Sequence, residues 1–328
     1  MFPSADTPGV SASAVLPDAA ARPSLARTVL PPLVAFGVLG AVLWPHAGEM
    51  WESAKLVSWQ VGVALVSLHL VALVLRAEAW AMCVAAAGLP VGRRDLHASS
   101  AFRFLADTIV PTYVGAWVRV AILKKLDPKR APTVGQMVTA DVILLLVEAG
   151  ITLVLVTIAV GNSSVDWWWV PVFAGLLAAV AAVGWALRHR FAERPFAKTF
   201  LVLRGRGRPA RLTAILAVVL LLQPIRFWLA LEAVGLDPTA IEALVTFLIT
   251  SVYGVLPIGP GPSSIGAATT VFGAANLAEA GAAGLILAST AVVAAALYSV
   301  YGGVTLSRRA RETAASREVP SMPAGTGR

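Results

Sequence analysis

Charged and metal-binding residues are scarce in this sequence. Only 13% of the 328 residues are charged, whereas 58% are hydrophobic. The one cysteine, Cys83, lies inside an apolar run, which excludes a disulfide framework and a cysteine-based metal site. The four histidines are scattered, and no zinc, haem or nucleotide motif occurs. We therefore expect no metal and no cofactor, and the chain offers no segment for a soluble catalytic domain.

Long apolar runs fill most of the chain instead. The mean hydropathy of +0.78 is typical of a polytopic membrane protein rather than a soluble domain. The formal net charge is +8, but most of the excess sits in a few short loops. Basic residues in such loops determine the orientation of a protein in the membrane. The positive net charge therefore does not indicate a nucleic-acid partner.

Six apolar segments are predicted to cross the membrane as helices: 28–44, 56–88, 134–160, 167–188, 214–235 and 282–306. Residues 1–26 are rich in Ala, Pro and Ser without periodicity and predict a disordered tail. A second polar tail is expected at 307–328. The transmembrane domain is therefore expected to occupy residues 27–306.

Two further apolar segments, 95–126 and 240–275, are interrupted by helix-breaking residues. Pro111 and Gly115 break the first, whereas Pro257, Gly259 and Gly261 break the second. A broken backbone is tolerated in a membrane only where protein or a water-filled cavity satisfies the freed polar groups. Each arm of about 15 residues would reach roughly 22 Å as helix, short of the ~30 Å hydrocarbon core.

The loop charges predict which side each segment faces. Basic loops at 22–27, 93–94, 124–130, 188–211 and 308–311 are expected in the cytoplasm. The first broken segment then begins and ends in the cytoplasm, and the second begins and ends outside. The predicted fold is all-α and polytopic, with six transmembrane helices and two re-entrant helical hairpins, and both termini are cytoplasmic.

The two halves of the chain also match each other. Trp80, Gly88, Pro111 and Gly115 align with another four residues at nearly the same spacing, Trp228, Gly235, Pro257 and Gly261. The halves, about 56–126 and 212–275, would run in opposite directions and so form an inverted repeat, an arrangement that places binding sites at interrupted helices. Chance similarity between Ala-, Leu- and Val-rich helices is the alternative.

At these residues the chain resembles the flippase-like membrane domain of lysylphosphatidylglycerol synthases and stand-alone proteins built from that domain. The first family motif reads Pro111-Thr-Tyr-Val-Gly115-Ala-Trp-Val-Arg119 here, and the second reads Leu256-Pro-Ile-Gly-Pro-Gly-Pro-Ser-Ser-Ile-Gly266. The likeness covers roughly residues 28–306, without the synthase half. It implies a lipid flippase in the bacterial plasma membrane, with no catalytic residues.

The sequence departs from the family pattern at three places. Ser263 and Ser264 replace glycines of the second motif, and Thr269 stands near the position of its usual Glu. The last span lacks its usual Arg. The span after the first broken segment has only Asp141 where the family carries a Glu-Arg pair.

The candidate site combines the broken segments with the charged residues inside apolar runs. A charge is costly to bury in a membrane, so such a residue is first interpreted as part of a functional site. Arginines and exposed helix N-termini suit the phosphate of a lipid headgroup. The predicted substrate-binding residues are Arg103, Asp107, Pro111, Gly115, Arg119, Arg226, Pro257, Gly259, Gly261, Ser263 and Ser264. Asp141, Glu148 and Glu232 are candidate charge partners or proton carriers.

Purely structural explanations compete with these functional assignments. Arg119 precedes Lys124 and is open to snorkelling toward the cytoplasmic surface. Arg103 and Asp107 are spaced as a helix-stabilising ion pair, and the pair of Arg76 and Glu78 favours a structural role. The serines of the second motif would either contact a headgroup or satisfy freed backbone groups.

The function that follows is a lipid flippase or transporter acting on an anionic or phosphate-bearing membrane lipid. A non-transporting membrane scaffold for lipid- or envelope-synthesis enzymes is the alternative, favoured by the departures in the second motif. A membrane enzyme acting on lipid-linked phosphate is the weakest hypothesis, because neither an Asp-rich metal motif nor a His-based phosphatase motif occurs.

Overall fold

The computed structural model describes residues 43–109, 113–127, 131–162, 195–253 and 260–318, with isolated positions at 37 and 41 and between 171 and 186. All regular structure in these residues is helical. Four helices are long and apolar enough to cross a membrane: α3 (Trp59–Ala86), α6 (Val134–Asn162), α8 (Gly207–Ala233) and α11 (Leu277–Glu318). They correspond to four of the six predicted spans. The spans predicted at 28–44 and 167–188 lie almost entirely outside the described residues.

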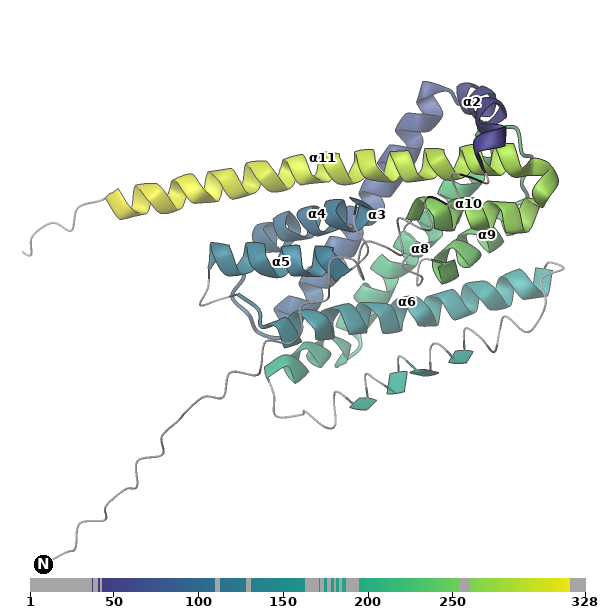
Figure 1. The fold of residues 1–328 in the computed structure, drawn as a ribbon. Coiled ribbons are helices and arrows are strands. Elements are labelled where there is room, and N and C mark those ends of the chain that lie inside the picture. The colour runs from purple at the N-terminus through teal and green to yellow at the C-terminus, as the bar shows by residue number, and fades with distance from the viewer. Residues whose placement is uncertain are drawn as a thin grey trace, which may run out of the picture.

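Two short helix pairs occupy the places of the interrupted segments. Helix α4 (Arg93–Ile109) packs on α5 (Tyr113–Leu126), and α9 (Ala240–Tyr253) packs on α10 (Pro260–Phe272). At 1.5 Å per residue these helices are about 20–26 Å long, shorter than the ~30 Å bilayer core. The pairs approach from opposite ends of the long helices, and their connected ends face one another near the middle of the molecule (Figure 1).

The remaining described elements are short. Before α3 come η1 (Trp44–His46) and α2 (Ala47–Lys55). The segment η2 (Pro195–Leu203) precedes α8, and η3 (Ala274–Asn276) links α10 to α11.

Two helices begin with the same reciprocal hydrogen bonds. Before α6, the Thr133 backbone N–H donates to Gln136 Oε1 (2.8 Å), and the Gln136 N–H donates to Thr133 Oγ1 (3.3 Å). Thr239 and Glu242 repeat this pattern at α9, at 2.8 and 3.2 Å. Each capping box satisfies backbone donors that a helix start leaves free, so these sequences fix where α6 and α9 begin.

Glycines end the two spans that precede the short pairs. Gly88 after α3 has φ 75° and Gly235 after α8 has φ 93°, a left-handed conformation that glycine adopts without steric penalty. Leucine follows each glycine. The shared turn agrees with the alignment of Gly88 with Gly235 in the predicted repeat.

Helix α11 contacts both short pairs along its length (Figure 1). A Cβ on Gly284 would lie 2.9 Å from the backbone N of Ile265 in α10, and one on Gly302 would lie 3.1 Å from the carbonyl oxygen of Ala98 in α4. The absence of side chains lets the backbones approach closely. Ser299 adds a hydrogen bond from its hydroxyl to the carbonyl of Ala101 (3.0 Å).

Helix α11 also corrects the predicted start of the C-terminal tail. The helix continues past residue 306 to Glu318, so the first part of the expected disordered tail is helical. An ion pair between Arg309 and Asp95 of α4 (3.2 Å) holds this extension against the rest of the protein. Helix and membrane span end at different points because polar residues with good helix propensity continue a helix into water.

Candidate functional site

Four charged side chains meet where α4, α5 and α6 come together. Arg103 Nη1 donates to Asp141 Oδ1 at 2.6 Å, and its Nε donates to Asp107 Oδ2 at 3.2 Å. Arg119 Nη1 donates to the same Asp141 oxygen at 3.4 Å. We call Arg103, Asp107, Arg119 and Asp141 the charge cluster. Its formal charges sum to zero, so burying it leaves no net charge.

Gly115 makes room for this cluster. A Cβ at Gly115 would collide with Asp107 Oδ1 and would lie 2.6 Å from the carbonyl oxygen of Arg103. The close spacing of the two helices therefore depends on the bare backbone at this position. The sequence predicted that Gly115 breaks the helix, which is wrong: Gly115 lies inside α5, directly against the charged side chains.

Arg119 is buried, which contradicts the interpretation that it snorkels to the surface. Its side chain is only 2% exposed, and its Cζ lies 3.8 Å from the ring centroid of Trp80 in α3. A cation over an indole face is stabilised by the ring's electron density. Trp80 and Asp141 together hold the guanidinium in the interior instead of leaving it free to extend outward.

The predicted pairing of Arg76 with Glu78 is wrong. Arg76 Nη2 instead donates to Glu148 Oε2 of α6 at 2.6 Å. Glu78 Oε2 accepts from Arg93 Nε at 2.7 Å and lies 3.1 Å from His97 Nε2. Residues two apart on a helix point in different directions, so each of the two finds a partner on another helix.

Arg226 of α8 is buried among neutral groups. Its Nη1 donates to His69 Nδ1 (2.7 Å) and to Gln223 Oε1 (2.8 Å), and its Nη2 donates to the Leu287 carbonyl (3.4 Å). Because a guanidinium only donates, His69 Nδ1 must be the unprotonated acceptor. No carboxylate pairs with Arg226 among the described residues, and its Nε has no hydrogen-bond partner there. Arg226 is 4% exposed, so an uncompensated positive charge lies in the interior.

One face of α3 connects these groups. Trp80 contacts Arg119, Arg76 pairs with Glu148, and His69 accepts from Arg226. The three α3 positions are spaced by four and seven residues, which places them on one helix face. They span about 16 Å along the helix axis. This polar line runs from the charge cluster to Arg226.

The remaining predicted residues divide into three groups. Ser263 and Ser264 are buried near the start of α10, and Gly261 lies in its first turn. Glu232 is exposed at the end of α8, away from the ion pairs above. Pro111, Pro257 and Gly259 lie outside the described residues.

Three side chains of the polar line were absent from the predicted site: His69, Arg76 and Trp80. Their common signal is the helical spacing on α3, which would have marked one polar face in an otherwise apolar span. Their partners on α5, α6 and α8 are 39 to 157 residues away in sequence and are visible only in the fold.

The described residues contain no group of three His, Cys, Asp or Glu side chains placed to hold a metal ion. The arrangement is instead suited to an anion, since guanidinium donors outnumber the carboxylates that face them. Arg103 and Arg119 share one oxygen of Asp141, and Arg226 has no acid partner in the described structure.

Comparison with family models identifies the chain. The model described as the lysylphosphatidylglycerol synthase TM region matches residues 29–307. Comparisons with curated proteins and with solved structures gave no match. The matched range includes α3, α6 and α8, helix α11 as far as residue 307, both short pairs and the polar line. The chain is a multi-pass membrane protein that belongs to the lysylphosphatidylglycerol synthase transmembrane-region family.

Proposed function

We propose that this protein is a lipid transporter that moves an anionic or phosphate-bearing lipid across the bacterial plasma membrane. The observation that carries the proposal is Arg226, which is buried with only neutral partners in the described structure. A charge near the middle of a bilayer costs about 3 kcal/mol or more. An anionic headgroup would supply the missing countercharge when it enters the interior.

The charge cluster supplies a second position for the same headgroup. Arg103 and Arg119 both donate to Asp141 Oδ1, so a phosphate with several acceptor oxygens would compete with that carboxylate. Asp141 is 30% exposed and is the most accessible member of the cluster. A headgroup would therefore reach the arginines from the side of Asp141, and the polar line on α3 joins this position to Arg226.

The proposed topology has six spans and two re-entrant hairpins related as an inverted repeat, with both termini in the cytoplasm. The short pairs α4–α5 and α9–α10 support it, because none of their helices reaches the length of the bilayer core. Their opposed approach in Figure 1 agrees with such a repeat. Transporters of this kind bind substrate where the interrupted segments of the two halves meet.

Glu148 is the proposed proton carrier. It is 11% exposed, and its Oε1 has no hydrogen-bond partner among the described residues, although Oε2 pairs with Arg76. Glu232 does not share this role, because it is exposed. Any uphill movement would then draw on a proton gradient, since the sequence carries no nucleotide motif.

Lipid movement in proteoliposomes tests the proposal. Fluorescent lipids with anionic, zwitterionic and cationic headgroups would be compared in wild type, Arg226→Gln and the double variant Arg103→Ala/Arg226→Ala. Arg208→Gln is the matched control, because Arg208 is exposed at the start of α8. We expect headgroup-selective movement that is lost in the site variants and kept in the control. Equal movement in all of them would reject the site.

One observation favours the alternative, a non-transporting scaffold for envelope-synthesis enzymes. The only charged residue in α9 and α10 is Glu242, at the start of α9. Thr269 stands near the family's Glu position, and its hydroxyl donates to the Ile265 carbonyl of its own helix (2.9 Å). A scaffold would support normal envelope growth in cells carrying the double arginine variant, whereas a transporter would not.

A further inference from the structure

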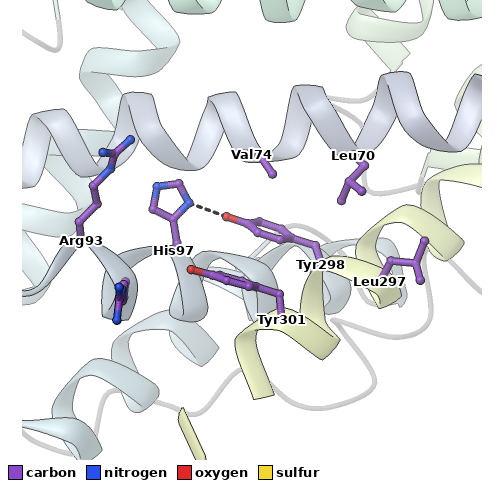
Figure 2. Close-up of a pocket in the computed structure, with 8 residues that line it drawn as sticks. Leu70, Val74, Arg93, His97, Leu297, Tyr298 and Tyr301 are labelled. Atoms are coloured by element: carbon purple, nitrogen blue, oxygen red, sulfur yellow. Dashed lines mark hydrogen bonds between the residues drawn. The ribbon is translucent and has the colours of Figure 1, made fainter. Parts of the chain in front are cut away.

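A pocket of about 620 Å³ opens between α3, α4 and α11, separate from the charge cluster and from Arg226 (Figure 2). Its lining changes from charged to apolar along its length. Figure 2 shows Arg93 at one end, Leu70 and Leu297 toward the other, and Tyr298 and Tyr301 between them. The full lining is Leu70, Val74, Arg93, Arg94, His97, Leu297, Tyr298 and Tyr301.

The apolar end faces the surroundings of the protein rather than its core. Val74 is 37% exposed and Leu297 is 51% exposed, although both lie on helices apolar enough to span a membrane. Exposed aliphatic side chains on such helices contact lipid chains. This end of the pocket is therefore open to the hydrocarbon of the bilayer.

The polar end carries an arginine without a counterion. Arg94 is exposed and forms no ion pair in the described part of the chain. Two nearby acids are already paired, Glu78 with Arg93 at 2.7 Å and Asp95 with Arg309 at 3.2 Å, and a third, Glu312, lies in the adjoining pocket. The positive end of the α4 dipole lies at the same place, because α4 begins at Arg93.

Side chains between the two ends are fixed by mutual contacts. His97 lies between two oxygens, with Nδ1 2.7 Å from Tyr298 Oη and Nε2 3.1 Å from Glu78 Oε2. The Tyr298 and Tyr301 rings stack with centroids 6.0 Å apart. Tyrosine is common where membrane hydrocarbon meets headgroups, because one end of its ring is apolar and the other polar.

A second pocket continues the basic end. It shares Arg94 and Tyr301 with the first and adds Arg308 and Arg309, together with the acids Asp95 and Glu312. Three arginines face two acids in this second pocket, so an excess of positive charge lies at one end of a groove whose other end meets lipid chains.

We infer that this groove binds one anionic phospholipid, with its phosphate at Arg94 and one acyl chain along Val74 and Leu297. A soluble anion would leave the apolar end unfilled, and an uncharged lipid would leave Arg94 without a partner. The volume lies within the roughly 300–1,000 Å³ typical of ligand sites. The inference does not depend on transport, because none of its residues belongs to the charge cluster or contacts Arg226.

Native mass spectrometry of the full-length protein in detergent tests this site. The probes are phosphatidylglycerol, phosphatidylcholine and glycerol 1-phosphate, which separate an anionic lipid from a zwitterionic one and from the free headgroup. We expect one tightly retained phosphatidylglycerol. Arg94→Gln should weaken its retention about five-fold, as expected for one arginine at a membrane surface. Arg208→Gln is the charge control.

The apolar end is tested by filling it. Val74→Trp should displace the acyl chain and reduce phosphatidylglycerol retention, whereas Val63→Trp, at a 55% exposed site on the same helix outside the pocket, should not. Retention equal to the controls in both Arg94→Gln and Val74→Trp would overturn the inference. So would full competition by glycerol 1-phosphate.

A further variant separates this site from the proposed transport site. Arg103→Met removes a member of the charge cluster but leaves the groove residues unchanged. We expect it to impair lipid movement but to retain the phosphatidylglycerol bound in the groove. Loss of the lipid in this variant would place the bound molecule at the charge cluster and would overturn the groove assignment.

Discussion

The guanidinium carbon of Arg119 lies 3.8 Å from the centre of the Trp80 ring, and this contact joins the first short pair to helix α3. Both side chains are almost completely buried. The same arginine reaches Asp141 on α6, so a single side chain connects three helices. Removing one of its partners should therefore affect the assembly of the whole region.

Replacing Trp80 tests the strength of this contact. Trp80→Leu should destabilise the protein by about 3 kcal/mol or more, because it leaves a cavity and removes the aromatic face from Arg119. Trp80→Phe should lose less, since it retains an aromatic ring. Thermal unfolding in detergent measures both. Trp228→Phe is the control from the other half; Trp228 is 39% exposed, and equal losses at the two positions would contradict a special role for Trp80.

Neutralising Asp141 should leave two arginines with one acid. We expect Asp141→Asn to destabilise the protein by about 2–3 kcal/mol, less than for a fully buried pair because Asp141 is 30% exposed. Adding Arg119→Met should recover part of the loss, because it restores charge balance. Melting temperatures of the two single variants and the double variant form a mutant cycle. Additive losses would show that Arg119 and Asp141 do not interact energetically.

Gly115→Ala should force α4 and α5 apart. The new methyl group would meet Asp107 and the Arg103 backbone, neither of which can move without disturbing the charge cluster. We expect a lower melting temperature and weaker lipid transport. Gly150→Ala in α6 is the matched control, because its added Cβ meets nothing within 4 Å. There the substitution should stabilise the helix by up to about 1 kcal/mol.

Replacing Arg76 and replacing Arg226 should change stability in opposite directions. Arg76→Met leaves Glu148 buried without its partner and should lower the melting temperature. Arg226→Met removes a charge that has no acid partner in the described structure, so the melting temperature should hold or rise. The second variant should nevertheless lose lipid movement. A large loss of stability in Arg226→Met would indicate a structural role for this arginine.

The sequence was sufficient to predict the four long helices and two short pairs that the structure describes, because their positions follow from apolar runs and from the residues that interrupt them. The span predicted at 56–88 is α3 at Trp59–Ala86, and both short pairs fall within the predicted interrupted segments. The ion pair between Arg103 and Asp107 was also predictable, since residues four apart on a helix are neighbours.

The partners across helices were not predictable from local spacing. Arg76 pairs with Glu148, 72 positions away, and the interior position of Arg119 depends on Trp80 and Asp141 on two other helices. Hydropathy likewise marks where a span ends but not where its helix ends. Helix α11 is therefore longer than the predicted span, because it continues to Glu318 through residues with good helix propensity.

The close packing of α11 has a mechanical consequence. Gly284 meets one short pair and Gly302 meets the other, 18 residues and about 27 Å apart on the same uninterrupted helix. One continuous helix thus contacts both pairs. If either pair moved, it would have to displace α11 or slide past the glycine against which it packs. A displacement of one pair would therefore be transmitted to the other pair, because α11 is continuous between the two glycines.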